Sequence, residues 1–512
     1  MTLSKAEISA IIRAAFDRDD SSGQPPWTVE LRRMLSALAE VEFRPGRASP
    51  LAKLCETGAS YGWQSLESAG PPSLLAAVSR RAKASLTRDL RRNLEQLTRP
   101  CFELEGRSFS LALNSMGTLA ESTDPRLVDR MFLGDKPGHR LFALFKNFPV
   151  LARLWSQLIS QWREQVTEVL LRFAADRRAL SRIFFNKPVG KTVNAQLSLS
   201  NRHNSGRTVA RLQFGAGSII YKPRGGTGES EWFSLLDWMN RQRFRPRLRI
   251  ARLLQRKNYC WMEYVETTSC KSEAGARRFY QRMGALTAAA YLVKAVDCHR
   301  DNLIASGENP VLVDTDALWH VSALSKTQSF SDVLHRTGFF PGSNFPRGLQ
   351  SRSSALGPGR AGTHLPRLAG ESLRAVNYQR EIARGFARAW RCILGTANRR
   401  HAFARRLRRI RSGERRWIYW PTEKYAAIMR ASIQPSVLRS GAERDRLIRG
   451  LCSRVNVPLT VVDAEILALK RLDIPYFERT TNEMPPADNL PVPNELVSTI
   501  RSALSDSRSA SR

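Results

Sequence analysis

Apolar and polar positions first follow a helical period. In residues 1–175 the apolar side chains recur at a spacing of three or four, as from Ile8 to Phe16 and from Leu141 to Leu158. Such spacing places the apolar side chains on one face of a helix, which is then buried. No constellation of catalytic side chains accompanies it. We therefore expect residues 1–175 to form a helical region with a structural core.

The period changes to two from about Val193. Alternating segments end at Ser200, Phe214 and Lys222, and turn-forming residues separate them at 201–206 and 215–217. Alternation of this kind predicts an antiparallel sheet. A helical pattern follows over 229–241, and two further strand patterns come after it. Lys222 therefore stands at the end of a predicted strand that precedes a helix.

The stretch from Asp297 to Asp316 combines acids with a predicted hairpin. It reads DCHRDNLIASGENPVLVDTD and follows an apolar helical pattern. Asn302 lies five positions after Asp297, and Asp314 follows the second strand. Phosphoryl transfer uses a carboxylate to orient the attacking hydroxyl, and an Asn and a second carboxylate to hold Mg²⁺. The order therefore indicates a kinase-type catalytic loop.

A structural role is the alternative for these residues. Asp, His and Asn also cap helices and build turns, so the pattern of Asp297, His299 and Asn302 is not decisive alone. Asp314 and Asp316 directly follow a buried strand pattern, where charge needs a metal or a partner, and this favours catalysis. We expect His299 to order the loop rather than to transfer a proton.

Lys222 is the candidate for the lysine that binds phosphate, which in kinases pairs with an acid. Glu229, Glu231 and Glu263 are all placed to be that acid, and the sequence does not choose among them. No G-x-G-x-x-G precedes Lys222, and the turn at 201–206 is the best placed to cover phosphates. This departs from an ordinary protein kinase.

We predict an α+β chain with a bilobal, lipid-kinase-like fold. Its parts are a helical region (1–175), a β-rich N-lobe (176–267), a mostly helical C-lobe (268–504) and a disordered tail (505–512). Residues 338–370, rich in Gly, Pro, Ser and Arg, stand where an activation loop would be, and a flexible insertion is the alternative.

Charge and cysteine content limit the class of protein. The chain has 512 residues and a formal charge of +35, which suits acidic partners unless the arginines are only solvated surface. Its seven cysteines form no C-x-x-C, so a reducing compartment is favoured. Without a signal peptide or an apolar run of membrane-spanning length, we expect a cytoplasmic protein.

Several segments together resemble a known family, the dehydratase part of class II lanthipeptide synthetases (LanM type). The resemblance covers about 148–477 in consistent order. It lies in the segments Tyr221-Lys222-Pro223-Arg224, Leu235 to Asn240, Trp261 to Val265, Asp297 to Gly307, Pro310 to Asp314 and Leu472 to Phe477.

The resemblance implies a two-step reaction on a ribosomally made precursor peptide. ATP would phosphorylate Ser or Thr, and elimination of phosphate would leave dehydroalanine or dehydrobutyrine. Carried over by position, Lys222 would bind phosphate, Asp297 and His299 would serve the catalytic loop, and Asn302 and Asp314 would hold Mg²⁺. The peptide's leader would be acidic if the charge of the chain reflects this partner; we expect no nucleic acid.

The family's remaining positions match less closely. A second acid, usually Glu, stands two positions after the metal-binding Asp, and here it is Asp316. Thr363 and Arg416 are the nearest matches to a Thr and an Arg used in elimination, and a second Arg is replaced by Trp420. No Cys/Cys/His cyclase site follows, so we expect dehydration without ring closure, or a separate cyclase.

Two other functions remain open. A kinase that stops after phosphorylation would result if the elimination residues are lost. A catalytically inactive scaffold that binds peptide is the third possibility, and the presence of Lys222, Asp297, Asn302 and Asp314 argues against it.

Overall fold

The computed structural model describes most of the chain in two compact units. One unit comprises Met1–Pro223 with Trp420–Tyr476, and the other Arg224–Tyr419 with Phe477–Arg512. The predicted boundaries at 175 and 267 stay a prediction. The described residues are 3–22, 25–38, 49–116, 131–134, 137–319, 330–341, 354–356, 362–412, 415–454, 457–479, 498, 500, 502 and 504.

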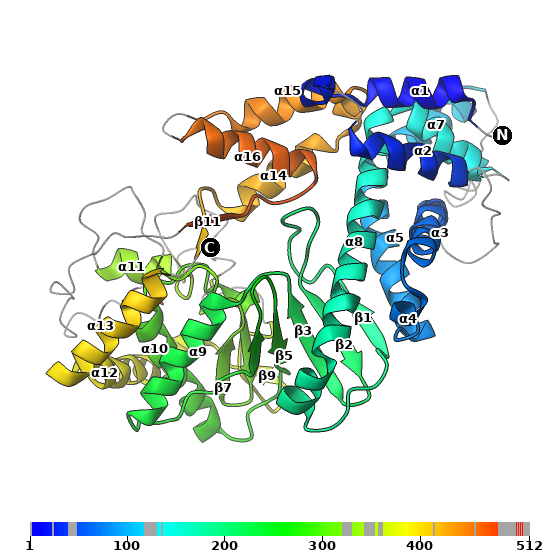
Figure 1. Ribbon diagram of the computed structural model, residues 1–512. Coiled ribbons are helices and arrows are strands. Elements are labelled where there is room, and N and C mark those ends of the chain that lie inside the picture. Colours follow the sequence, from blue (N-terminus) through cyan, green and yellow to red (C-terminus); the bar gives the residue numbers. More distant parts are fainter. Residues whose placement is uncertain are drawn as a thin grey trace. The chain divides into compact units, whose positions relative to one another are not determined.

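The first unit is mainly helical, as the apolar spacing predicted, with a small sheet (Figure 1). Its helices are α1 (Lys5–Ala14), α2 (Pro26–Leu38), α3 (Pro50–Ala69), α4 (Pro72–Leu75), α5 (Arg80–Ser115), α7 (Pro137–Asn147), α8 (Pro149–Leu180), α14 (Thr422–Ser432), α15 (Gly441–Cys452) and α16 (Leu459–Lys470). Short helical turns are η1 (Arg18–Ser22), η2 (Ser181–Phe185) and η5 (Pro435–Val437). The strands are β1 (Asn194–Gln196), β2 (Ala210–Phe214) and β3 (Gly217–Lys222).

Helices α3, α5 and α8 build the core of this unit around Trp155. The indole nitrogen of Trp155 donates a hydrogen bond of 2.8 Å to the hydroxyl of Thr98, so its one polar atom is satisfied although the ring is fully buried. A Cβ at Gly58 would lie 2.4 Å from the Trp155 ring. The helices therefore approach closely only because residue 58 has no side chain.

The expected antiparallel sheet is confirmed for the three strands of this unit. β1 pairs with β2, with Ala195 opposite Leu212, and β2 pairs with β3, with Ala210 opposite Tyr221. Along β2 buried and half-buried residues alternate, as the period of two predicted. β3 ends at Lys222, so this lysine stands at a strand end.

The turn before the lysine strand is held by an acid from the C-terminal segment of the same unit. The backbone N–H groups of Ser205 and Gly206 donate to the Asp473 carboxylate at 2.7 Å and 2.9 Å. His203 and the neighbouring Ile474 are joined by a hydrogen bond of 2.8 Å between the ring and the carbonyl. Two amides of the turn that we proposed to cover phosphates therefore bind Asp473 in this structure.

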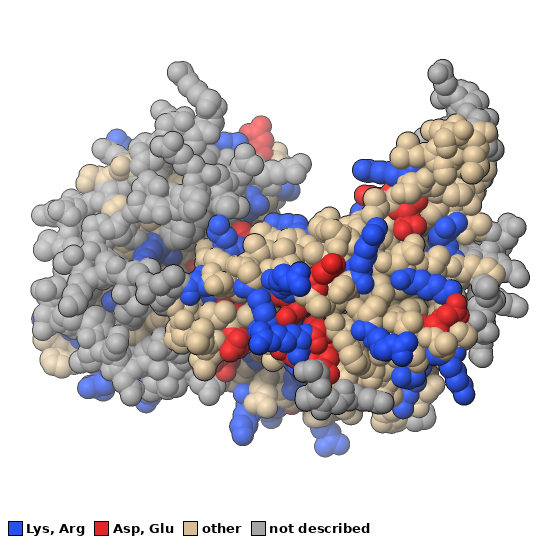
Figure 2. Space-filling view, turned by 90° about the horizontal axis from the view of Figure 1, so that it is seen from above, with Lys and Arg blue, Asp and Glu red and all other residues tan. Residues whose placement is uncertain are grey.

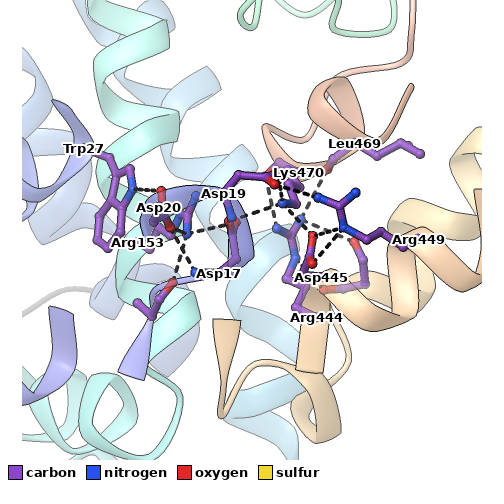
Figure 3. A network of polar contacts seen from close by, with 12 residues as sticks. Asp17, Asp19, Asp20, Trp27, Arg153, Arg444, Asp445, Arg449, Leu469 and Lys470 are labelled. Carbon is purple, nitrogen blue, oxygen red and sulfur yellow. Dashed lines mark hydrogen bonds and ion pairs between the residues drawn. The ribbon is translucent and has the colours of Figure 1, made fainter. Parts of the chain in front are cut away.

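A buried group of ion pairs joins the beginning of the first unit to its last two helices (Figure 3). We call it the inter-segment ion network. Lys470 contacts Asp17 at 3.2 Å and also pairs with Asp19 and Asp445. Arg153 lies 3.2 Å from Asp17. The members are Asp17, Asp19, Asp20, Asp445, Arg153, Arg449 and Lys470, together with Arg444, whose guanidinium donates to the carbonyls of Lys470 and Leu469.

The described part of the second unit combines helices with three short hairpins and one pair of strands that are distant in sequence. Its helices are α9 (Thr227–Arg241), α10 (Glu273–Leu292), α11 (Phe330–Arg336), α12 (Gln379–Leu394) and α13 (Ala397–Ser412), with the turns η3 (Arg300–Asn302) and η4 (Ala375–Tyr378). The strands pair in sequence as β4 (Leu253–Gln255) with β5 (Cys260–Glu263), β6 (Leu303–Ser306) with β7 (Asn309–Leu312), β8 (Arg367–Leu368) with β9 (Glu371–Ser372), and β10 (Arg415–Trp417) with β11 (Phe477–Arg479).

Helices α10 and α12 meet through a pair of glycines. A Cβ at Gly284 would lie 1.9 Å from the carbonyl oxygen of Ile382, and one at Gly385 would lie 1.8 Å from that of Gln281. Neither position has room for a side chain, so the two backbones touch. Helix α10 is thereby fixed on α12. This contact also fixes where the loop after α10, which contains Asp297, begins.

Other sequence expectations concern the whole chain. The structure describes a mixed α/β chain with small antiparallel sheets, as expected, and leaves the lipid-kinase-like arrangement a prediction. All seven cysteines are buried and free. No helix among the described residues is long and apolar enough to cross a membrane. Most of 338–370, expected to be an activation loop or an insertion, lies outside the described residues.

Candidate active site

The loop after α10 holds Asp297 in an unusual backbone conformation. The φ angle of Asp297 is +66°, a region that residues with a side chain rarely adopt. The N–H of the next residue, Cys298, donates a hydrogen bond of 2.8 Å to the carbonyl of Thr337, which fixes the loop directly after Asp297. Strained backbone persists where the surroundings enforce it and is frequent at functional sites. The conformation of Asp297 is therefore consistent with a positioned carboxylate.

Asn302 connects this loop to the hairpin that follows. Its side-chain nitrogen donates a hydrogen bond of 2.8 Å to the backbone carbonyl of Asp297. Its backbone carbonyl accepts a hydrogen bond of 2.8 Å from the N–H of Val313. The hairpin of β6 and β7, with Leu303 opposite Leu312, thus returns the chain to Asn302 just before Asp314. Because the amide nitrogen is engaged, the side-chain oxygen of Asn302 is left as the acceptor.

Arg224 binds the two acids that follow the hairpin. Its guanidinium pairs with Asp314 and lies 3.5 Å from the carboxylate of Asp316. It also contacts Glu229, in the first turn of α9, at 3.3 Å. Glu229 is only 1% exposed, and an ionised carboxylate at such depth needs a cation. One arginine therefore neutralises part of a three-carboxylate cluster.

The close approach of α9 to the same acids depends on a glycine. A Cβ at Gly228 would lie 2.1 Å from the carbonyl oxygen of Thr315, which stands between Asp314 and Asp316. Any other residue at position 228 would push the first turn of α9 away from this segment. Gly228 therefore allows Glu229 to share Arg224 with the two aspartates.

Arg416 links the same acids to the catalytic loop. Its guanidinium lies 3.4 Å from Asp297 and 3.8 Å from Asp316, and its backbone N–H donates 3.2 Å to the carbonyl of Asp316. It is carried by β10, which pairs with β11 and places Arg416 opposite Glu478. We call the connected group the acidic-loop ion network. Its members are Glu229, Asp297, His299, Asp314, Asp316, Arg224 and Arg416.

The network shifts the pKa of two members. Burial lowers the pKa of His299, but hydrogen bonding and charge attraction from Asp297, 3.3 Å away, outweigh it, so the pKa of His299 is raised above its ordinary value. Burial and the neighbouring charge of Asp314 raise the pKa of Asp316 to about 6, although Arg224 and Arg416 oppose this. Desolvation and a neighbouring like charge raise a carboxyl pKa, and a neighbouring carboxylate favours the imidazolium.

The donor atoms fit a magnesium ion. Asn302 and Asp314 supply an amide oxygen and a carboxylate, which are the oxygen ligands that Mg²⁺ prefers. Within the described ranges, no three His, Cys, Asp or Glu side chains are gathered closely enough to form a ready metal cluster. In this structure the guanidinium of Arg224, rather than a group of further ligands, lies against Asp314 and Asp316.

The remaining candidate residues have different environments. Lys222 is 4% exposed and belongs to the first unit, where it ends β3. Glu263, one of the acids considered for it, binds Arg249 at 2.8 Å and Arg252 at 3.3 Å. Thr363 has an exposed side chain, and its carbonyl accepts 2.7 Å from the N–H of Ala305, which places it beside β6. The structure thus brings Arg416 to the acids and records for Thr363 only this contact with β6.

Sequence reasoning did not assign a role to Arg224. The signal was present, because Arg224 lies two residues after Lys222 and five before Glu229. Nothing in the local pattern, however, says that residues 90 positions later will supply its partners. Glu229 was considered as one possible partner of Lys222, which stays a prediction, and the structure shows in addition its contact with Arg224.

Comparison with known proteins places the chain in a family. A family model described as "Domain of unknown function (DUF4135)" matches residues 148–364 and 358–480, which is more than half of the chain. The chain belongs to this family. The matched DUF4135 segment contains Lys222 and all members of the acidic-loop ion network.

One similar protein has a curated description. It is the "Lacticin 481/lactococcin biosynthesis protein LcnDR2" of Lactococcus lactis subsp. lactis, which is 24% identical over 190 residues. The aligned part is 35% of this chain, and the chain spans only 20% of the length of that relative.

Proposed function

We propose that this DUF4135 chain is a peptide dehydratase of the lanthipeptide type. It would phosphorylate Ser or Thr in a ribosomally made precursor peptide and then eliminate the phosphate. The similarity to a lacticin biosynthesis protein supports involvement in lanthipeptide synthesis. The observation that carries the chemistry is the acidic-loop ion network, which joins Asp297, Asp314 and Asp316 through Arg224 and Arg416.

Phosphorylation needs an oriented hydroxyl and neutralised phosphate oxygens. In our proposal Asp297 accepts the proton of the attacking hydroxyl, and the positive charge favoured on His299 holds the Asp297 carboxylate in place. Asn302 and Asp314 would hold Mg²⁺, which supplies charge neutralisation at the phosphates when bound. Lys222 is assigned to the phosphates of ATP. The bilobal, lipid-kinase-like fold expected from the sequence, with lobes at 176–267 and 268–504, belongs to the same proposal.

Elimination needs a base and a stabilised leaving group. A base removes the α-proton of the phosphorylated residue, the Cβ–O bond breaks, its electrons leave with the phosphate, and a Cα–Cβ double bond forms. Arg416 is the arginine nearest to the loop acids after Arg224, so we assign it to the departing phosphate. Asp316 is assigned to position Arg416, because its backbone carbonyl accepts a hydrogen bond from the backbone N–H of Arg416. Thr363 is retained as an elimination residue by resemblance to the LanM dehydratases alone.

The intact mass of a co-expressed precursor peptide tests the proposal. Each dehydration removes about 18 Da, and each phosphorylation that is not followed by elimination adds about 80 Da. We expect losses of about 18 Da with the wild-type chain and an unchanged peptide with Asp314→Asn. Dehydration by Asp314→Asn would remove Asp314 from the metal-binding role.

A kinase without elimination is the second candidate, because the position of a second elimination arginine holds Trp420. Gains of about 80 Da with no losses would establish it. An unchanged peptide that nevertheless co-purifies with the chain would instead support an inactive scaffold. Ring formation by a separate cyclase would leave the mass after dehydration unchanged and is scored by loss of free peptide thiols.

A further inference from the structure

Helix α12 carries a straight row of arginines on its solvent side. Arg380, Arg384, Arg388 and Arg391 are all exposed, at spacings of four, four and three. That spacing keeps side chains on one face of a helix. The opposite face holds buried residues that include Ile382 and packs on α10. We call these four residues the α12 arginine row.

The row has no acidic partner in the described part of the chain. None of its four guanidiniums forms an ion pair with a described carboxylate; Arg388 contacts Gln281 at 3.5 Å, and Arg391 contacts the carbonyl of Ala387 at 3.3 Å. The following helix, α13, adds seven arginines and no acid, and four of its arginines, Arg400, Arg405, Arg408 and Arg409, are exposed. Positive charge therefore accumulates along both helices.

Several arginines on other surface helices of this chain are matched by acids on the same helix. Arg241 pairs with Asp237, Arg277 with Glu273, and Arg449 with Asp445, each four residues apart on one helix. On the face seen in Figure 2, acidic side chains likewise lie among basic ones. In the α12 arginine row, four exposed arginines share one face of a helix without an ion pair to a described carboxylate.

We propose that the α12 arginine row binds an acidic polypeptide. The guanidinium group of arginine binds a carboxylate through two parallel hydrogen bonds, which suits Glu and Asp side chains. Residues four apart on a helix are separated by about 6 Å along its axis. Alternate side chains of an extended strand repeat at about 6.7 Å, nearly the same distance. An extended segment with acids at every second position therefore matches the row over about 16 Å.

Two other classes of partner fit the surface less well. Single-stranded nucleic acid is bound by basic grooves with exposed aromatic rings on which bases stack. The aromatic residues of these helices, Phe386, Trp390 and Phe403, are buried. A membrane-surface helix presents an apolar face to lipid, but the apolar face of α12 is covered by α10. The acidic polypeptide is the partner that the charge alone can recognise.

Binding of a fluorescent peptide, measured by anisotropy without nucleotide, tests this proposal independently of any enzymatic activity. The probe is a twelve-residue peptide of alternating Glu and Ser. The test variant carries R380Q, R384Q, R388Q and R391Q. The control variant loses the same charge from exposed arginines spread over the chain: R13Q, R80Q, R247Q and R446Q.

We expect the test variant to bind the peptide at least tenfold more weakly than wild type. The affinity of the control variant should fall less than threefold. Replacing the four residues by Lys keeps the charge without the planar fork, so binding should fall between wild type and the Gln variant. A peptide of equal composition with all Glu at one end should bind the wild type more weakly.

Equal losses in the test and control variants would overturn the proposal, because the binding would then reflect net charge alone. Tighter binding of a twelve-nucleotide RNA that the peptide cannot displace would also overturn it, in favour of nucleic acid. Because all eight arginines are exposed, we expect near-native thermal unfolding midpoints. If the Gln variant unfolds, the Lys variant and the rearranged peptide decide the question.

Discussion

The two ion networks of this molecule are both built from acidic and basic side chains, but they differ in the numbers of each. The inter-segment network in the first unit has four acids and four bases, and its central Lys470 is only 4% exposed. The acidic-loop network in the second unit sets four carboxylates against two arginines and His299. The carboxylates of the acidic-loop network are oxygen ligands of the kind that Mg²⁺ prefers.

Exposure differs between particular acids of the two networks, although Asp19 in the first is 49% exposed and Glu229 and Asp316 in the second are 1% and 8% exposed. Asp17 and Asp445 have side chains that are 5% and 6% exposed, whereas those of Asp297 and Asp314 are 29% and 25% exposed. Water and ligands can therefore reach the acidic-loop network but not the centre of the other. We expect mutations in the first network to change stability and mutations in the second to change activity.

The largest effect on activity is expected for Asp297→Asn. A general base contributes about 10²–10⁴-fold, and the amide cannot accept the hydroxyl proton. Phosphorylation of the precursor, followed by peptide mass, should fall by that factor, while the thermal midpoint changes little because the side chain is partly exposed. A large drop in the midpoint with activity retained would reverse the roles assigned to the two networks.

Lys470→Met should have the largest effect on stability. It leaves Asp17, Asp19 and Asp445 without their shared cation, and breaking a buried pair typically costs about 3–5 kcal/mol. Denaturant unfolding measures the loss, with Arg446→Gln as the control because Arg446 is an exposed basic residue on the adjacent helix α15. A loss no larger than that of the control would show that the network does not stabilise the first unit.

Asp316→Asn should alter how stability depends on pH. The pKa of Asp316 is raised from 3.8 to about 6, so ionising this carboxyl opposes folding; the cost is absent below about pH 4 and complete above about pH 6. The full cost is about 3 kcal/mol, since each pKa unit corresponds to about 1.4 kcal/mol. Loss of the Arg224 and Arg416 pairs acts in the opposite direction.

Thermal midpoints of wild type and Asp316→Asn, measured from pH 4 to pH 8, check this sign. Relative to wild type, the variant should gain stability as the pH rises from about 4 to about 6, and the difference should then stay constant. A difference that is constant over this range would show that Asp316 titrates normally.

Arg416→Ala should give the smallest change, confined to the second chemical step. Without this guanidinium the departing phosphate loses a counter-ion, so phosphorylated peptide should accumulate by about tenfold relative to wild type, equivalent to about 1.4 kcal/mol. Mass spectrometry of the peptide measures the ratio of the gain of about 80 Da to the loss of about 18 Da. Equal loss of both products would assign Arg416 to phosphorylation or to folding instead.

The sequence by itself predicted the local elements of the site. Alternation located the strand that ends at Lys222, and the spacing from Asp297 through Asn302 to Asp314 located the loop and hairpin that the structure contains. The helix from Thr227 to Arg241 was likewise expected from its apolar spacing. These features depend on neighbouring residues, whose periods and turn residues can be read directly from the chain.

Only the tertiary structure decided which charges meet. Arg224 binds Asp314, 90 positions away, Arg416 binds Asp297, and Lys470 binds Asp17 from the other end of the chain. In a chain with 81 Lys and Arg residues, each acid has many candidate partners, and no local pattern distinguishes them. Backbone approaches such as those at Gly228 and Gly284 fix the partners, because they set which elements come within reach of a guanidinium.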